Sequence, residues 1–273
     1  MKMSEKLAFI GAGSMAESIL TGIVNSEFFP KEQIFVTNKS DKDRLAFLKK
    51  QYDVQNTEDK QRTVDGADIV VIAVKPYDVE AAVTSIRNYL NANQLLISVV
   101  AGVSTDRISQ LIGKEVPVVR AMPNTSSAAG QSATAVTRGK FAAEKHLKTA
   151  LDLFNTIGTA TEVAEADMHT VTGISGSGPA YVYYLVEAME SAAVSAGLDH
   201  ATAHDLITQT IVGAGEMLKT SGLNPSKLRE NITSPGGTTQ AGIETLAERN
   251  FQETVMSCVD SARERSIELG KKL

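Results

Sequence analysis

The sequence predicts an α/β protein in which a doubly wound sheet is followed by an all-helical C-terminal domain. Three observations carry this prediction. The short apolar run 7–10 leads through a glycine-rich turn into a helical pattern. Further β-branched runs alternate with helical patterns up to residue 163, which is typical of a sheet covered on both faces. From there on only helical patterns follow, so we expect one domain at 1–164 and a second at 165–273.

The glycine-rich turn has the form Gly-x-Gly-x-x-Ala and lies between a strand and a helix, as a dinucleotide-binding fingerprint requires. Gly11 permits the tight turn, Gly13 leaves the backbone open to a pyrophosphate, and Ala16 lets helix and strand pack closely. The helix start offers free N–H groups and the positive end of its dipole to phosphates. We therefore expect a Rossmann-like dinucleotide-binding domain. The alternative is a plain strand-to-helix turn without a ligand.

The end of the second expected strand, 33–37, indicates which dinucleotide binds. A site for NAD usually places Asp or Glu here to hold the ribose 2′-hydroxyl. This chain continues with Asn38, Lys39 and Ser40, and Asp41 comes later. A carboxylate about 4 Å from a 2′-phosphate would cost roughly 4 kcal/mol per charge pair at an effective dielectric constant of about 20. The sequence therefore favours NADPH over NADH, and the alternative is a polar loop that binds nothing.

The remaining strands place several loops on one rim of the sheet. Near-continuous apolar runs are typical of parallel strands covered on both faces. The further strands are expected at 67–74, 94–100, 116–120, 132–137 and 159–163, with helices at 79–90 and 141–157. Ligands of such sheets bind outside the carboxyl ends of the strands. The loops that should gather beside Gly11–Met15 are Lys75-Pro76, Ala101-Gly102 and Met122–Asn124.

Composition limits the partners. The 273 residues carry a net charge of −5, with a pI of about 5.5, which argues against nucleic acid or an anionic membrane. Cys258 is the only cysteine, which excludes an internal disulfide and fits a reducing compartment. There is neither a signal-peptide pattern nor an apolar run near the ~20 residues of a membrane helix, so we expect a cytoplasmic protein. His200 and His204 have no further ligands nearby, and we expect no metal site.

The C-terminal half predicts an oligomer. No Lys or Arg occurs between Thr149 and Leu218. Apolar residues recur at helical spacing on one face of a helix at 182–196, and a second helix is expected over 201–220. Helices this apolar should pack against other helices, some of them from a second copy of the chain. We therefore expect at least a dimer.

A second informative motif, Ser-Pro-Gly-Gly-Thr-Thr at 234–239, precedes a helix expected to begin near Ala241. Glycines and threonines at a helix N-terminus bring N–H groups and hydroxyls together, and such an anion site would suit a free carboxylate. The alternative is a helix cap with a flexible lead-in, which Thr238 or Thr239 could provide alone. The motif by itself does not decide between the two.

In combination, these motifs resemble the pyrroline-5-carboxylate reductase family over essentially the whole chain. The last motif resembles the family signature and is far more specific than the glycine turn. The segments that carry the resemblance are Ile10–Met15, Ala73–Pro76, Val99–Val103, Arg120–Thr125, Gly173–Tyr181, Pro225–Leu228, Ile232–Thr239 and Gly242-Ile243.

The resemblance implies an oxidoreductase that acts on a CH–NH group. It implies reduction of the cyclic imine 1-pyrroline-5-carboxylate to L-proline with NADPH, or alternatively NADH, as the last step of proline biosynthesis. It also implies that the helical C-terminal domain binds substrate and dimerises. A cyclic imine is basic enough to be protonated near neutral pH, so the site needs orientation and a hydrogen-bonding partner more than a strong acid.

The resemblance also assigns roles to individual residues. The residues implied for the cofactor are Gly11, Ala12, Gly13, Ser14 and Met15 at the pyrophosphate, Asn38, Lys39 and Ser40 at the adenosine ribose phosphate, Val74, Lys75, Pro76 and Ala101 at the nicotinamide, and Asn231. The residues implied for the substrate are Glu165, Gly237, Thr238 and Thr239. Thr239, nearest the ring nitrogen, and Glu165 are the expected catalytic residues. Glu165 could instead cap the helix that follows. The family also uses an Asn between the second and third strands, for which Asn56 is a candidate.

Two other functions fit parts of the pattern. Dehydrogenases of the β-hydroxyacid class also join a glycine-turn domain to a helical one, but they need a lysine on the first long helix of the second domain. The lysine-free stretch from Thr149 to Leu218 counts against them. A nucleotide-binding regulatory protein without catalysis would have no use for the anion motif at 234–239.

Overall fold

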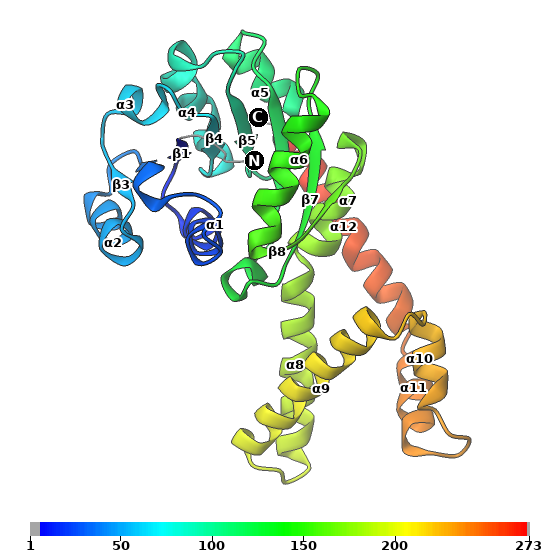
Figure 1. The fold of residues 1–273 in the computed structure, drawn as a ribbon. Coiled ribbons are helices and arrows are strands. Elements are labelled where there is room, and N and C mark those ends of the chain that lie inside the picture. The colour runs from blue at the N-terminus through cyan, green and yellow to red at the C-terminus, as the bar shows by residue number, and fades with distance from the viewer. Residues whose placement is uncertain (1–5, 272–273) are drawn as a thin grey trace. The chain divides into compact units, whose positions relative to one another are not determined.

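The computed structural model describes residues 6–271 and divides them into two compact units (Figure 1). The first unit combines the described residues up to Ser177 with those from Asp260 onward, and the second holds Gly178–Val259. The predicted fold class is confirmed, since a sheet of strands and covering helices is followed only by helices after Glu162. The units are defined by contacts rather than by where the helical pattern begins. The domain boundary at residue 164 therefore stays a prediction.

Eight strands form one sheet in the order β3-β2-β1-β4-β5-β6-β7-β8. The strands are β1 Leu7–Ile10, β2 Ile34–Thr37, β3 Gln55–Asn56, β4 Ile69–Ile72, β5 Leu95–Ser98, β6 Val118–Met122, β7 Ser132–Arg138 and β8 Gly158–Glu162. After β3 the chain crosses to the other side of β1, where β4 pairs with β1 in parallel. The carboxyl ends of β1 and β4 thus form the switch point at which such sheets bind ligands.

The structure differs from the expected strands in two places. β3 has only two residues and no apolar run, so its pattern carries no strand signal. β7 runs antiparallel to β6, whereas all other neighbouring strands are parallel. The connection between β6 and β7 is built on the short 3₁₀ turn η4, Thr125–Ala129. A parallel pairing needs a crossover of a dozen residues or more, so this short connection dictates the antiparallel direction.

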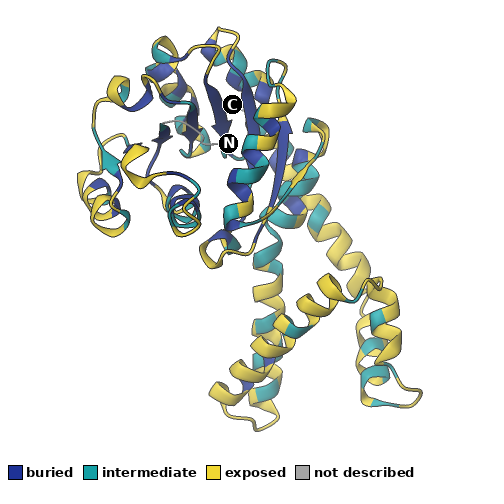
Figure 2. Ribbon diagram, in the orientation of Figure 1, coloured by how far each residue is buried: buried dark blue, intermediate teal, exposed yellow. Residues whose placement is uncertain are grey.

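Helices cover both faces of the sheet and bury it (Figure 2). The helices of this unit are α1 Ser14–Asn25, α2 Lys42–Tyr52, α3 Lys60–Val64, α4 Val79–Ile86, α5 Thr105–Ile112, α6 Glu144–Phe154 and α7 Met168–Val171. Alternate side chains of β1 enter two separate cores. Leu7 and Phe9 belong to the core with α1, α2 and α6, and Ala8 and Ile10 to the core with α4 and α5. Burial on both faces explains the near-continuous apolar strands.

The second unit is helical and largely exposed (Figure 2), and many of its exposed side chains are apolar. It contains α8 Gly178–Ser195, α9 His200–Thr220, α10 Pro225–Asn231, α11 Thr238–Glu248 and the first part of α12, Phe251–Lys271. Its exposed large side chains include Tyr184 at 76%, Met256 at 67% and Leu206 at 58%. A single copy of the chain therefore leaves uncovered the apolar helices that the sequence expects to be packed. No helix within 6–271 is both long and apolar enough to cross a membrane.

Candidate active site

The glycine turn has the backbone that a dinucleotide fingerprint requires. Gly11 follows β1 with φ +109°, and an added Cβ would lie 2.2 Å from the carbonyl oxygen of Ala73. Only glycine fits there, between the end of β1 and the end of β4. Gly13 is the N-cap of α1, no side chain caps this helix, and an added Cβ at Gly13 would meet nothing within 4 Å. The first N–H groups of α1 are therefore open to a phosphate.

Neighbouring contacts hold this turn in place. The N–H of Gly11 donates to the Thr37 carbonyl at 2.8 Å, and Arg44 Nε donates to the carbonyl of Ala12 at 2.7 Å. Arg44 also forms an ion pair with Glu17 on α1. Ser14 and Met15, which complete the predicted pyrophosphate site, form the start of α1. The five residues predicted for the pyrophosphate thus form the turn after β1 and the first residues of α1, at the switch point.

A cavity of about 130 Å³ lies beside the turn, at the carboxyl ends of β1, β2 and β4. Asn38, Lys39 and Val74 line it, as does Asp78, whose Oδ1 is 3.5 Å from Lys39 Nζ. Ser40 is exposed and is not among the lining residues. Asp41 lies outside the cavity and caps α2 by accepting a hydrogen bond from the Arg44 N–H at 2.8 Å. The first acidic residue after β2 in the sequence is therefore engaged in capping a helix.

The same cavity contains a lysine that the sequence analysis missed. Lys60, the first residue of α3, lines it together with Lys39. Asn56, the candidate between the second and third expected strands, instead donates its amide to the Leu45 carbonyl at 2.8 Å. The available signal was a basic residue following the helix cap Asp59, but a lysine at a helix start is too common to single out. Only the packing of α3 beside β1 and β2 brings Lys60 to this cavity.

These residues fit the phosphorylated ribose of a dinucleotide. Two lysines against one aspartate give the cavity a net positive charge. Thr37 Oγ1 is buried at the cavity wall and has no hydrogen-bond partner within the described part of the chain. A buried hydroxyl without a partner is unfavourable unless a ligand or water satisfies it. The open helix N-terminus, the two lysines and this hydroxyl are suitable partners for phosphate and ribose groups.

A second cavity of about 460 Å³ lies farther along the same rim. Pro76 and Ala101, predicted for the nicotinamide side, line it, and Lys75 between the two cavities is exposed. The opposite wall comes from Thr172, Ser177 and α12, which contributes Ser266. Since Val74 lines the first cavity and Pro76 the second, the loop after β4 connects the two.

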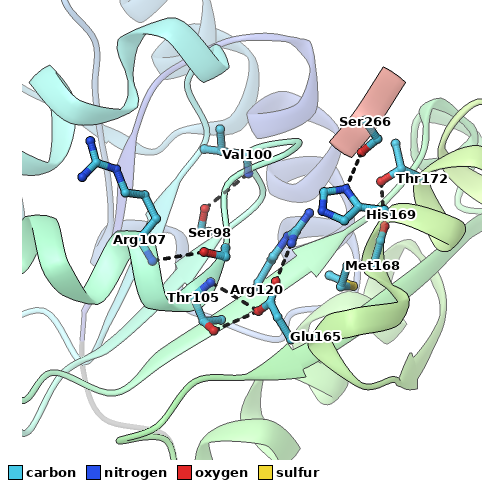
Figure 3. Close-up of polar contacts among 11 residues, drawn as sticks. Ser98, Val100, Thr105, Arg107, Arg120, Glu165, Met168, His169, Thr172 and Ser266 are labelled. Carbon is cyan, nitrogen blue, oxygen red and sulfur yellow. Dashed lines mark hydrogen bonds and ion pairs between the residues drawn. The ribbon is translucent and has the colours of Figure 1, made fainter. Parts of the chain in front are cut away.

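Glu165 lies in a buried polar cluster near the start of the helical region (Figure 3). Arg120 on β6 is 1% exposed and donates from Nη1 to Glu165 Oε1 at 2.5 Å. Thr105 donates to Oε2 from its hydroxyl at 2.8 Å and from its N–H at 3.2 Å. Both carboxylate oxygens are thus partnered, and a third of the side chain is exposed. Glu165 is not among the residues that line the second cavity, so its predicted role at the substrate stays a prediction.

His169 connects this cluster to the second cavity. Its Nδ1 lies 2.9 Å from the hydroxyl of Ser266, a residue of the cavity wall (Figure 3). Burial lowers the pKa of His169 below its usual value, and the positive charge of Arg120 lowers it further, while Glu165 opposes the shift. His169 therefore favours the neutral form. In this form it joins α7 to α12 through its hydrogen bond with Ser266, and it adds no further positive charge beside Arg120.

The remaining predicted residues lie in the helical unit. Gly237 is the N-cap of α11 with no side-chain cap, and Thr238 and Thr239 form its first turn. Gly236 has φ +71°, and its N–H is held by Gln240 Oε1 at 2.7 Å. The helix therefore begins at Thr238, three residues before the predicted start near Ala241. Its first N–H groups are not capped by a side chain. Asn231 ends α10 in the same unit and is exposed. A site shared between this unit and the cavities above stays a prediction.

The fold and the rim define a class of protein. A parallel sheet with a glycine turn at its switch point, an uncapped helix N-terminus and a positive cavity beside it is a pyridine-nucleotide-binding oxidoreductase fold. Residues 6–102 match the family described as NADP oxidoreductase, coenzyme F420-dependent. Residues 165–269 match the family described as pyrroline-5-carboxylate reductase dimerisation.

Whole-chain comparisons identify the family. Pyrroline-5-carboxylate reductase 2 of Bacillus subtilis is 44% identical over 97% of this chain and 95% of its own length. A solved pyrroline-5-carboxylate reductase from Coxiella burnetii superposes with a TM-score of 0.91 at 34% identity, covering 97% of this chain and 98% of that one. A Plasmodium falciparum pyrroline carboxylate reductase with NADP bound gives 0.87 at 34% identity, with the same coverage. This chain belongs to the pyrroline-5-carboxylate reductase family.

The cluster around Glu165 generates a stability prediction. Glu165→Ala leaves the buried guanidinium of Arg120 without its counter-charge, which should lower the free energy of unfolding by about 3 kcal/mol. Glu144→Ala is the matched control, because Glu144 pairs with Arg138 at 2.7 Å on the surface. That loss should stay below about 1 kcal/mol. Urea denaturation at one fixed protein concentration measures both, and equal losses would show that the Arg120 pair is no more than a surface contact.

Proposed function

We propose that this chain reduces 1-pyrroline-5-carboxylate to L-proline, the last step of proline biosynthesis, with NADPH as the preferred reductant. The observation that carries the proposal is family membership over nearly the whole chain, at 44% identity to a relative of that name. The two cavities lined by the loop after β4 support it, because one suits a phosphorylated ribose and the other lies where the reacting ring would be placed. The proposed enzyme class is an oxidoreductase that acts on a CH–NH group.

The direct test compares substrates and reductants on the purified full chain. NADPH oxidation should depend on pyrroline-5-carboxylate, and NADH should support a lower kcat/KM because the cavity charge favours the extra phosphate. A 3-hydroxy acid with NADP serves as the control for the β-hydroxyacid dehydrogenase alternative and should give no reduction of NADP. Turnover of the hydroxy acid alone, or of neither compound, would overturn the proposed function.

The preference for NADPH rests on the charges beside the first cavity. We assign the ribose phosphate to Lys39 and Lys60, with Asn38 and Ser40 beside them. Asn38 donates its amide to the Asp41 carbonyl at 2.6 Å, which fixes the loop that carries Lys39. Asp78 pairs with Lys39 from the other side and holds it over the cavity. When bound, the reduced nicotinamide supplies a hydride. Val74, Lys75, Pro76 and Ala101 are the residues proposed to bind its end of the cofactor, and Asn231 is proposed to contact the cofactor as well.

Lys60→Gln should change cofactor preference without abolishing activity. Loss of one cation beside the phosphate is expected to raise KM for NADPH about tenfold, equivalent to roughly 1.4 kcal/mol, while KM for NADH changes less than about twofold. Lys42→Gln is the control, because Lys42 pairs with Glu58 at 2.8 Å outside the cavity. Steady-state kinetics with both reductants measure the ratio. An equal effect on NADH and NADPH would exclude Lys60 from phosphate recognition.

For the substrate we propose the start of α11. The carboxylate of the substrate would accept hydrogen bonds from the uncapped N–H groups around Gly237, Thr238 and Thr239. The Thr239 hydroxyl would bond the ring nitrogen, where a proton must end as the imine carbon is reduced. Because an iminium is already cationic, this partner orients the ring rather than acting as a strong acid. Glu165, held by Arg120 and Thr105, would add a negative charge on the substrate side.

Thr239→Ala should lower kcat/KM for pyrroline-5-carboxylate by roughly a hundredfold, since a hydrogen-bonding group used in the transition state is worth about 3 kcal/mol. Thr239→Ser keeps the hydroxyl and should recover most of the activity. Thr245→Ala is the control on the same helix, because the Thr245 hydroxyl only donates back to the Ala241 carbonyl at 3.0 Å. Initial rates under saturating NADPH measure all three variants. Wild-type turnover in Thr239→Ala would remove Thr239 from the reaction.

We further propose that the helical region, 165–273, serves for substrate binding and forms at least a homodimer, and that 1–164 binds the dinucleotide. The family match at 165–269 and the exposed apolar side chains of the second unit support the oligomer. Light scattering at micromolar concentration tests it, and a monomer would refute it. A cytoplasmic location, with no nucleic acid or membrane as partner, follows as a proposal from the charge and the absence of a membrane-spanning helix within 6–271.

A further inference from the structure

The helical connection after α7 contains a widened turn. Residues Thr172–Gly176 form a π-helix, in which the N–H of Ser177 donates to the Thr172 carbonyl at 2.8 Å. The hydrogen bond spans five residues rather than the four of an α-helix, so one residue is inserted into the turn. Such an insertion disturbs the regular pairing of backbone carbonyls. It is stable only when other groups donate hydrogen bonds to the carbonyls that lose their helical partners.

Asn124 donates a hydrogen bond to this turn from a distant part of the sequence. Its side-chain Nδ2 donates to the Ser175 carbonyl at 3.0 Å, in the middle of the widened turn. The amide oxygen accepts from the Ser126 N–H at 3.1 Å, and the Asn124 N–H donates to Ser132 Oγ at 3.2 Å. Asn124 is 7% exposed. Both ends of its amide are therefore used, and its position is fixed by the loop after β6 and by β7.

A second contact from the same strand end supports the turn. Met122, the last residue of β6, lies so close to Gly176 that an added Cβ would be 2.8 Å from its methyl carbon. Gly176 therefore leaves room for the end of the Met122 side chain against the turn. The segment Met122–Asn124 contacts two successive residues of the widened turn, once by packing and once by a hydrogen bond.

The two ends of this turn face the second cavity. Thr172 and Ser177 both line it, opposite Pro76 and Ala101. Asn124 itself is not among the lining residues. The conformation of the turn decides where Thr172 and Ser177 lie. The amide of Asn124 stabilises that conformation through the Ser175 carbonyl, without lining the cavity itself.

We propose that Asn124 is a positioning residue for the reaction, which holds the substrate-side wall of the cavity by donating to the Ser175 carbonyl. The inference rests on the proposed function, because it takes the ring of the imine to occupy the space between Pro76, Ala101 and this wall. It concerns the substrate rather than the dinucleotide, whose phosphates are assigned to the other cavity.

Asn124→Asp tests the hydrogen bond directly. The ionised carboxylate keeps the acceptor for Ser126 but has no proton to donate to Ser175. Kinetics at about pH 8 should show kcat/KM for pyrroline-5-carboxylate lowered roughly 30- to 100-fold, with KM for that substrate raised, because small misplacements of bound groups have effects of this size. KM for NADPH should stay within about twofold. A loss of folded protein alone would lower kcat and leave both KM values unchanged.

The pH profile of the same variant gives a readout that a general structural defect would not give. Burial raises the pKa of an introduced carboxyl, and its protonated form donates one hydrogen bond and accepts another, as the amide does. The groups that contact Asn124, on Ser126, Ser132 and Ser175, are uncharged. The titratable groups on the adjoining elements, His169 beside Arg120 and Glu165, are present in both proteins. The activity of Asn124→Asp relative to wild type should therefore recover several-fold as the pH falls from about 8 to about 6.

Two controls make the outcome decisive. Asn124→Ala has no titratable group and should show the same loss of activity at every pH. Asn155→Asp changes another amide, which does not line the cavity and whose oxygen accepts a hydrogen bond of 2.9 Å from the Ala160 N–H. This variant should behave as wild type. Wild-type kinetics in Asn124→Asp, or a loss that does not recover at low pH, would overturn the inference. An inactive wild type would instead overturn the proposed function.

Discussion

The close approach of Gly11 to the end of β4 is the constraint on which the rest of the site depends. Because the Ala73 carbonyl lies where a Cβ would be, the ends of β1 and β4 can meet only with glycine at this position. The start of α1 and the loop after β4 are thereby brought to the same rim. That loop then lines one cavity with Val74 and the other with Pro76. A single backbone contact thus places both cavities on the same rim of the sheet.

The end of β6 organises the opposite wall. Arg120 pairs with Glu165, Met122 packs on Gly176, and Asn124 holds the Ser175 carbonyl. These contacts join one strand to the helical region that begins after the sheet. His169 and Ser266 add a link to α12, whose Gly270 lies so close to Gly102 that an added Cβ would be 2.7 Å from its carbonyl oxygen. Polar and close-packed contacts, rather than apolar burial alone, determine the shape of the second cavity.

The helical unit has a different balance of interactions. Its first helix, α8, has no buried residue, although its sequence is rich in apolar side chains. The sheet-containing unit, by contrast, buries both faces of its strands in two cores. Apolar side chains left in water by one copy of the chain favour association, which agrees with the dimerisation family matched at 165–269.

The sequence by itself determined the α/β order, the glycine turn and the family, because these depend on local patterns: apolar runs, residues that permit special backbone angles, and contiguous motifs. It predicted Asn38, Lys39, Pro76 and Ala101 beside cavities for the same reason, since each lies in a short loop after a strand. Only the tertiary structure decided the antiparallel β7, the two-residue β3, the place of Lys60, the buried pairing of Glu165 and the contact of Asn124 with Ser175. These features join residues up to 60 positions apart, and the pairing of distant polar groups leaves no periodic signal in a sequence.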